Sequence, residues 1–143
     1  MKWTHEYNHI VFPEDANHMG TIFGGKLVSV IDLAVAQHTM ILLKQEASEC
    51  DDAVTVSFAN VNFHFGAVVG DLLTIRSDVD KIGIKSMTFR FSVHRLVDGK
   101  LIADGTTVFV ARKNGVAHAH GIPTCKNEPF AFKTGLIGAS VKS

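Results

Sequence analysis

The sequence predicts an α+β fold in which a curved antiparallel sheet wraps around one long central helix. Its most apolar stretch, Leu27 to Leu43, has the length and composition of a core helix. The alternating apolar segments that follow it have no helix between them, which favours antiparallel strand pairing. Because the helix is apolar on nearly every side, either a sheet that curls round it or a partner subunit must cover it.

The first elements are set by turn residues and by apolar spacing. A short strand is predicted around His9 to Phe12, and a loop rich in turn formers follows over Pro13 to Gly20. We expect the helix to run from about Phe23 to Gln45. Its apolar part is interrupted by Asp32 and falls short of the roughly 20 apolar residues that cross a bilayer, so it is interpreted as a core helix.

Beyond a polar loop over Glu46 to Asp52, apolar and polar residues alternate in four strand candidates. The first of them changes phase between Phe58 and Val61, which predicts a β-bulge or a strong bend. Taken as a meander, the four strands cover Val54 to Phe65, Leu73 to Val79, Met87 to His94 and Leu101 to Arg112, with an Asp98-Gly99 hairpin turn before the last.

Length and composition favour a single domain with no dominant charge. The chain has 143 residues, of which 46% are hydrophobic, and 14 basic side chains balance 14 acidic ones, so we expect neither nucleic acid nor a membrane as a partner. Cys50 and Cys125 give no disulfide framework and the N-terminus lacks a secretory signal, which favours a reduced, cytoplasmic setting. We assign residues 1–123 to the domain and expect residues 124–143 to form a loosely ordered tail.

One acidic side chain, Asp32, interrupts the apolar helix. A carboxylate in a buried helix is costly unless it is paired or faces a cleft, so this position is a candidate for chemistry. Gly24 and Gly25 mark the helix start, where unpaired N–H groups stabilise negative charge and glycine lets a ligand come close. The acid and the glycine-marked helix start are therefore the candidate site residues of this chain.

The segment around these residues resembles the signature of hotdog-fold acyl-CoA thioesterases, specifically the bacterial and the animal cytosolic acyl-CoA hydrolases. The residues that carry the resemblance are Pro13-Glu14-Asp15-Ala16-Asn17-x-x-Gly20-x-Ile22-Phe23-Gly24-Gly25-x-Leu27-x-x-x-x-Asp32. Weaker matches follow in register, so that the resemblance spans about Ile10 to Pro123. It implies the hotdog architecture, a curved antiparallel sheet around one helix, in agreement with the fold predicted from the patterns.

The resemblance also implies an activity, the hydrolysis of fatty acyl-CoA to the free acid and coenzyme A, with no other cofactor and no metal. Asp32 would activate the attacking water or attack the carbonyl directly, and the amides at Gly24 and Gly25 would polarise that carbonyl. Asn17 would complete the site from the facing subunit. A homodimer would be the smallest working unit, assembled further into a tetramer or a hexamer built as a trimer of dimers.

For the nucleotide end of coenzyme A, the resemblance points to the turn Gly83-Ile84-Lys85-Ser86, whose backbone and side chains would hold the pyrophosphate. The family often has a basic residue directly after this glycine, where the present chain has Ile84. Arg112 and Lys113, at the end of the last strand, are further candidate phosphate ligands.

Two other functions stay open on the sequence. Related hotdog enzymes hydrate or dehydrate thioesters with a histidine paired to the helix acid, and His18 with Asp32 would imitate that pair, although the His-Phe-Pro-Gly type loop of the dehydratases is absent. A non-catalytic acyl-CoA-binding module is the other. His118 and His120 have no further ligand nearby in sequence and so do not predict a zinc site. His64, at the end of a strand, is assigned no role.

Overall fold

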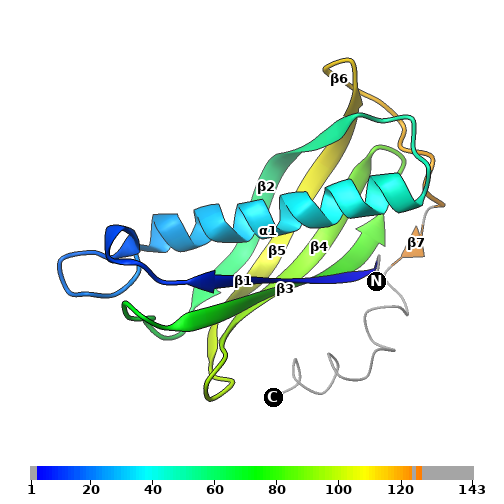
Figure 1. Ribbon diagram of the computed structural model, residues 1–143. Coiled ribbons are helices and arrows are strands. Elements are labelled where there is room, and N and C mark those ends of the chain that lie inside the picture. The colour runs from blue at the N-terminus through cyan, green and yellow to red at the C-terminus, as the bar shows by residue number, and fades with distance from the viewer. Residues whose placement is uncertain (1–2, 124, 127–143) are drawn as a thin grey trace.

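Within the described residues, one α-helix and one antiparallel sheet make up most of the fold (Figure 1). The computed structural model describes residues 3–123 and 125–126. The elements, in chain order, are β1 (Thr4–Ile10), the 3-10 helix η1 (Pro13–Asp15), α1 (Gly24–Gln45), β2 (Asp52–Phe63), β3 (Leu72–Ile82), β4 (Ser86–Arg95), β5 (Leu101–Lys113), β6 (Val116–Ala117) and β7 (Cys125–Lys126).

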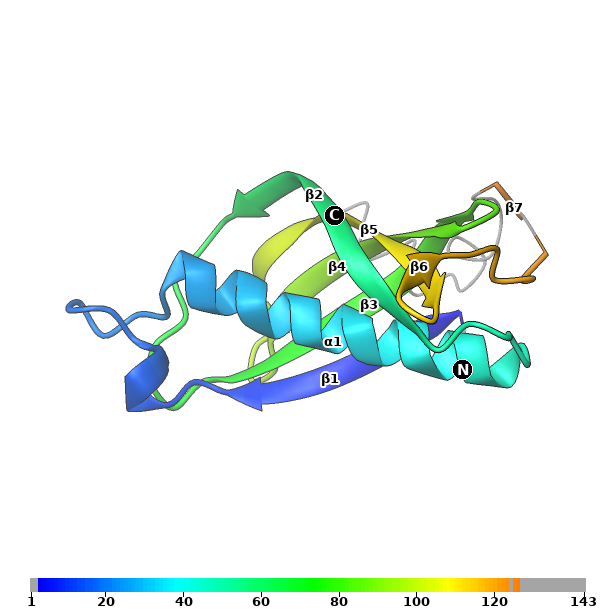
Figure 2. The same ribbon diagram turned by 90° about the horizontal axis from the view of Figure 1, so that it is seen from above.

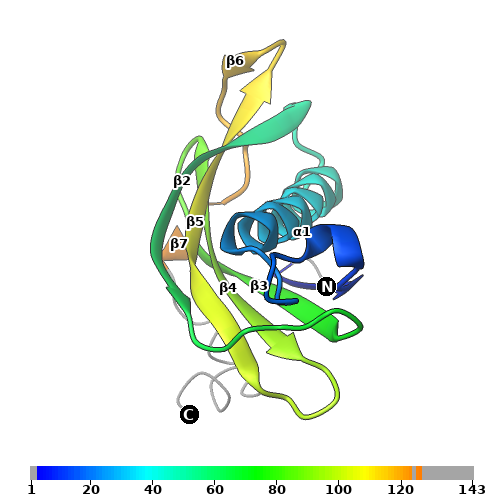
Figure 3. The same ribbon diagram turned by 90° about the vertical axis from the view of Figure 1, so that its left-hand side faces the viewer.

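The sheet curves around α1, which confirms the predicted α+β architecture (Figures 2 and 3). The inner face of the helix packs on apolar side chains of the central strands, such as Ile75, Phe89 and Phe109, all of them buried. Its own buried residues are Leu27, Val30, Ile31, Ala34, Val35, His38, Thr39, Leu42 and Leu43. At 22 residues α1 is long and apolar enough to cross a membrane by length and composition, unlike the shorter stretch expected, but half of its most apolar window is buried inside the domain.

The predicted four-strand meander is wrong for one strand. The strand order is β1-β3-β4-β5-β2, so only β3, β4 and β5 follow one another as a meander. β2 pairs with β5 at one edge of this path and β1 pairs with β3 at the other. An alternating pattern shows which face of a strand is buried but not which strand lies beside it. Because β1 and β2 lie at opposite ends of the strand order, they flank α1 on opposite sides.

The predicted bulge in β2 is confirmed, and a second one is present. Register shifts fall between Ala59 and Asn62, where Asn60 has a positive φ of 52°, and between Thr55 and Ser57. The second shift changes the phase of the strand, so that Thr55 and Phe58 both face the interior, opposite Phe109 and Thr107 of β5. β2 consequently bends along the helix instead of running straight past it.

The first strand is longer than predicted and begins earlier. β1 covers Thr4–Ile10, whereas the sequence predicted a short strand around His9 to Phe12. Its half-buried positions are taken by His5, Tyr7 and His9, alternating with exposed neighbours. Histidine and tyrosine rings carry polar atoms, so these positions do not form the apolar alternation that predicts a strand. His5 is held by a hydrogen bond between its Nε2 and Gln37 Oε1 of α1, at 3.1 Å.

Most of the segment predicted as a tail, residues 124–143, lies outside the described residues. The exception is β7, in which Cys125 and Lys126 pair with Ile82 and Lys81 of β3.

Gly105 offers a test of how tightly the interior is packed. A Cβ at this position would lie 2.7 Å from Cζ of the buried Phe91 and 3.1 Å from Cα of Val61. We therefore expect Gly105→Ala to lower the free energy of unfolding by about 1–3 kcal/mol through overpacking, as measured by urea denaturation. Gly25→Ala is the control, because a Cβ there meets no atom within 4 Å. Equal midpoints for the two variants would contradict this packing.

Candidate functional site

Asp32 projects from α1 toward β2 and is half-buried. The Thr55 hydroxyl donates a hydrogen bond of 2.5 Å to Asp32 Oδ1, while Oδ2 has no partner among the described residues. Asp32 also lines a groove of about 410 Å³ between α1 and β1, together with Tyr7 and His9. The carboxylate is therefore oriented by one neighbour, Thr55, and its second oxygen is unpaired within the described residues.

Thr55 is a contact that the sequence did not single out. Alternation with Val54 and Val56 assigns it to the polar face of the strand, away from the helix. Thr55 nevertheless faces the interior, and it lies next to the bulge between Thr55 and Ser57 that the sequence did not predict. No spacing rule read from the sequence alone would have paired Thr55 with Asp32, because bulge positions do not follow from alternation.

The start of α1 carries free backbone donors. Phe23 is the N-cap, and its carbonyl accepts the first intrahelical bond, from the Leu27 amide at 2.9 Å. Among the described residues, nothing accepts a hydrogen bond from the amides of Gly24, Gly25 and Lys26. Both glycines are exposed. Helix starts of this kind stabilise anions and developing negative charge.

Asn17 sits in the loop before the helix with its side chain fixed in one orientation. Its Oδ1 accepts hydrogen bonds from the Met19 amide at 2.8 Å and from the Thr21 amide and hydroxyl, both at 3.2 Å. Because backbone amides only donate, the atom that faces them must be the carbonyl oxygen. The Asn17 amino group is thereby turned away from the loop, and no described residue accepts its hydrogens.

Asp15 joins the loop to both of its neighbours, and its role was missed at the sequence level. It is 2% exposed, and its carboxylate contacts His9 Nε2 at 2.8 Å, the Phe12 amide at 3.0 Å and Lys26 Nζ at 3.4 Å. Burial works against the charged form, but the hydrogen bonds from Phe12, His9 and Lys26 outweigh it and lower the pKa of Asp15. One buried carboxylate thus ties β1, η1 and the first turn of α1 together.

The predicted catalytic residues fall into two groups within one chain. Asn17, Gly24 and Gly25 lie at the N-terminal end of α1. Asp32 lies about two turns further on, or about 12 Å along the axis at roughly 1.5 Å per residue. A single chain therefore does not place the carboxylate and the free amides around one small reacting group.

The turn predicted to hold the pyrophosphate is closed by Gly83 and Ser86. The Gly83 amide donates to the Ser86 carbonyl at 2.9 Å, and a Cβ on Gly83 would lie 2.5 Å from Ser86 Oγ, so a side chain here would displace Ser86. Ile84 and Lys85 are exposed at the tip. Buried His120 donates from Nε2 to the Ser86 carbonyl at 3.2 Å, and burial lowers the pKa of this histidine.

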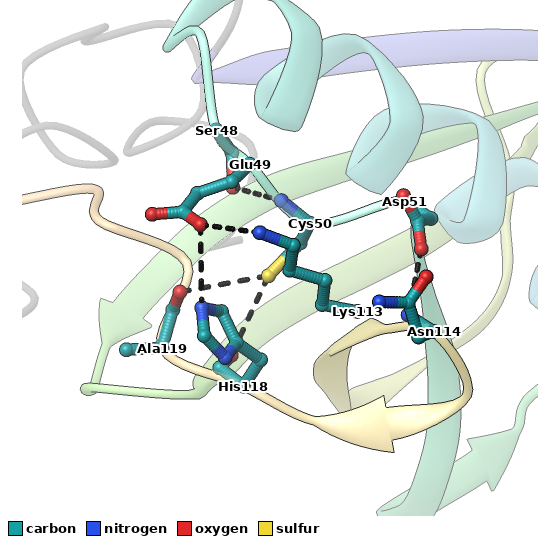
Figure 4. A network of polar contacts seen from close by, with 8 residues as sticks. All are labelled: Ser48, Glu49, Cys50, Asp51, Lys113, Asn114, His118 and Ala119. Carbon is teal, nitrogen blue, oxygen red and sulfur yellow. Dashed lines mark hydrogen bonds and ion pairs between the residues drawn. The ribbon is translucent and has the colours of Figure 1, made fainter.

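Arg112 and Lys113, the other predicted phosphate ligands, are already paired with carboxylates. Arg112 makes two bonds of 2.9 Å to Asp52, and Lys113 Nζ lies 2.7 Å from Glu49 Oε1. The hydrogen bonds to these carboxylates raise the pKa of Arg112 and of Lys113. Figure 4 shows Lys113 and Glu49 together with their neighbours around the end of β5. A phosphate would have to share either cation with its carboxylate or compete with that carboxylate for it.

The histidines occupy separate environments. His118 lies 3.7 Å from Glu49 (Figure 4), whereas His120 Nδ1 accepts a bond from the Ile122 amide at 3.0 Å. His64 contacts Asp104 at 3.3 Å, and His18 is exposed. Within residues 3–123, no three His, Cys, Asp or Glu side chains gather as a metal-ligand set.

A separate cavity of about 450 Å³ lies over the polar side chains of β3, β4 and β5 and contains no predicted site residue. Its charged members form a network in which Arg76 contacts Asp78 at 3.4 Å. Burial raises the pKa of Asp78 to about 6, although the charges of Arg76 and Arg90 work in the opposite direction.

A long helix held in a curved antiparallel sheet, with an acid on the helix and glycines at its start, defines the hotdog class of α+β proteins. The chain belongs to the thioesterase superfamily, whose family model matches residues 19–102, and it is therefore a thioester hydrolase. No curated protein matches it in sequence.

Solved structures of similar proteins agree with this assignment. An acyl-CoA hydrolase from Staphylococcus aureus, solved with butyryl coenzyme A, coenzyme A and coenzyme A disulfide, is 26% identical with a TM-score of 0.74, covering 99% of this chain and 81% of that one. A hexameric acyl-CoA thioesterase is 28% identical, with a TM-score of 0.73 and coverage of 99% and 87%. Solved variants of the S. aureus hydrolase replace an aspartate, a threonine and an asparagine by alanine.

The buried carboxylate of Asp15 can be tested by its contribution to stability. We expect Asp15→Ala to lower the free energy of unfolding by about 1–3 kcal/mol at pH 7, because buried donors lose their acceptor. The pKa of Asp15 is lowered from its ordinary 3.8, so its stabilisation is present above pH 3.8 and is lost as the pH falls through the folded value. Urea denaturation at pH 7 and pH 3 measures both effects.

Glu14→Ala is the matched control, since Glu14 is an exposed acid in the same short helix. It is expected to change stability by no more than about 0.5 kcal/mol. A difference between wild type and Asp15→Ala that grows toward acid pH would contradict the assignment.

Proposed function

We propose that this protein hydrolyses fatty acyl-CoA thioesters and that Asp32 carries the reaction. The observation that supports this is the placement of Asp32, held by Thr55 with one carboxylate oxygen unpaired, on the helix of a thioesterase-superfamily fold. Aspartate, asparagine and threonine, the residue types replaced in the S. aureus variants, are also the types found here at Asp32, Asn17 and Thr55.

The reaction is a transfer of the acyl group to water. Asp32 Oδ2 takes a proton from water while the water oxygen bonds to the carbonyl carbon. The carbon–sulfur bond then breaks, and the coenzyme A sulfur leaves with that proton as a thiol. In the second form of the mechanism Asp32 attacks the carbonyl carbon itself, the carbon–sulfur bond breaks and coenzyme A leaves as a thiolate. Water then hydrolyses the resulting anhydride, which releases the free acid, restores the Asp32 carboxylate and provides the proton that the thiolate takes up. The bond from Thr55 to Oδ1 orients the carboxylate in both forms.

The amides of Gly24 and Gly25 are proposed to stabilise the negative oxygen that forms during attack. Donors held in place before the reaction are the most effective, because they need no reorganisation as charge develops. The Asn17 amino group, fixed by three bonds to its own carbonyl oxygen, would donate to the same oxygen or orient the water.

The separation of Asp32 from these donors favours a site shared by two subunits. β2 is an edge strand with exposed apolar surface at Val56, and the outer face of α1 exposes Leu33 and Met40. Unpaired edges of this kind are suited to joining a second copy. In the proposed homodimer, Asp32 of one subunit acts with Asn17 and Gly24 of the other, and such dimers assemble into a tetramer or a hexamer.

For the nucleotide end of coenzyme A, we propose the Gly83–Ser86 turn as the principal contact. Lys85 is exposed there and its backbone carbonyl is engaged with the Ala111 amide, which holds the turn against β5. Arg112 and Lys113 are weaker candidates because both are paired with carboxylates.

Replacing the carboxylate by an amide of the same shape tests the proposed reaction. We expect Asp32→Asn to lower kcat by about 10²- to 10⁴-fold with little change in fold, since proton transfer is lost while an oxygen remains for Thr55. Release of free thiol from acyl-CoA measures the rate, and loss of an enoyl group on an enoyl-CoA substrate monitors hydration. Glu14→Gln is the control, because it makes the same carboxylate-to-amide change at an exposed position outside the proposed site. Wild-type turnover by Asp32→Asn would exclude the mechanism.

Two inactive variants together test whether the site is shared. Asp32→Asn and Asn17→Ala, each inactive alone, are co-expressed with different tags so that hybrid dimers can be isolated. If one site takes Asp32 and Asn17 from different subunits, each hybrid dimer has one intact site out of two. Random pairing makes half of the dimers hybrids, so the unfractionated mixture regains about a quarter of wild-type activity. Purified hybrids without activity would show that each site is built within one chain.

A further inference from the structure

We propose that a pocket beside the start of α1 receives the acyl chain and that Phe63 sets the chain length it accepts. The inference rests on the proposed thioesterase function and names the substrate class of that site. The pocket measures about 360 Å³ and lies between the helix start, the end of β2 and the loop that follows it. Ile22, Gly24, Leu27, Phe63 and Phe65 line it.

The pocket begins where the carbonyl would be held. Gly24 lines it, and the Gly24 amide has no acceptor among the described residues. A carbonyl oxygen bound at that amide places the carbonyl carbon, and therefore the first methylenes of the acyl chain, at the edge of the pocket. The hydrocarbon then has an apolar surface to follow directly from the reacting bond.

The walls favour hydrocarbon over polar chains. Apart from His64, the side chains that line the pocket are apolar, and His64 Nε2 is engaged with Asp104 at 3.3 Å. Phe63 and Phe65 are 53% and 52% exposed, a large apolar surface for two neighbouring aromatic positions in an uncovered pocket. An acyl chain lying against both rings would remove this surface from water.

Phe63 is the wall closest to the reacting group. A Cβ built on Gly24 would lie 3.7 Å from Phe63 Cζ, so the ring rests against the helix start. The Phe65 ring is held from elsewhere, because Lys100 Nζ lies 3.8 Å from its centroid. Substitution of Phe63 therefore changes the room beside the carbonyl, whereas Phe65 is anchored to the β4–β5 hairpin.

The Phe63 ring, and not the volume of the pocket, limits the length of the acyl chain, because the pocket is uncovered and so does not enclose the chain. In the wild-type protein, contact with Phe63 therefore disfavours longer acyl chains.

The test compares kcat/KM over saturated acyl-CoAs from butyryl to palmitoyl, by thiol release, for the full-length wild type and for Phe63→Ala and Phe63→Trp. Phe63→Ala should raise the ratio of kcat/KM for palmitoyl over octanoyl by about tenfold, and Phe63→Trp should lower it. Leu96→Ala, at an exposed apolar position in the β4–β5 hairpin, should leave the ratio unchanged. Thermal melts confirm folding, and Phe63→Leu replaces any variant that does not fold.

The possible results distinguish a failure of the acyl-pocket inference from a failure of the proposed thioesterase function. Hydrolysis by the wild type with the same chain-length profile in every Phe63 variant would overturn the acyl pocket while leaving the thioesterase intact. An absence of hydrolysis with every acyl-CoA would overturn both. Opposite shifts for Phe63→Ala and Phe63→Trp would establish the pocket.

Discussion

The burial of one apolar helix is the constraint on which the rest of this structure depends. The inner face of α1 is apolar and must be kept from water, so the sheet bends around it, and the bulges of β2 are part of that bend. The same bend brings Thr55 against the helix, at the position of Asp32. The curvature that covers the core therefore also provides the partner of the candidate catalytic acid, and fold and site share one origin.

The features predicted correctly are those that a short stretch of chain determines by itself. The extent of α1, the glycines at its start and the unusual placement of Asp32 all follow from local composition. The position of β2 beside β5 and the inward turn of Thr55 depend on residues far apart in sequence, and alternation contains no information about them. β1 was placed too late because its inner positions are His5, Tyr7 and His9, whose rings only partly resemble a buried apolar face.

The phosphate ligands illustrate a different limit. Arg112 and Lys113 are basic residues at a strand end, a pattern that suits phosphate binding equally well as ion pairing. Only the fold shows that Asp52 lies opposite Arg112 in the β2–β5 ladder and that Glu49 lies within reach of Lys113. Both cations consequently link the end of β5 to the α1–β2 loop and the start of β2, which leaves the Gly83–Ser86 turn as the better candidate for coenzyme A.

The geometry of the helix explains why the site is better built from two chains than from one. Free amides occur only at a helix start, whereas an acid whose neighbours are to exclude water must lie further along, where the sheet covers it. A single straight helix keeps these two requirements about 12 Å apart at roughly 1.5 Å per residue. In the proposed homodimer, two antiparallel copies of the helix would bring the start of one near the middle of the other, and each copy would then supply what its partner lacks. Asp15 matters in this arrangement because it fixes the loop with Asn17 to the helix start, so that these donors would reach the proposed subunit interface as one rigid unit.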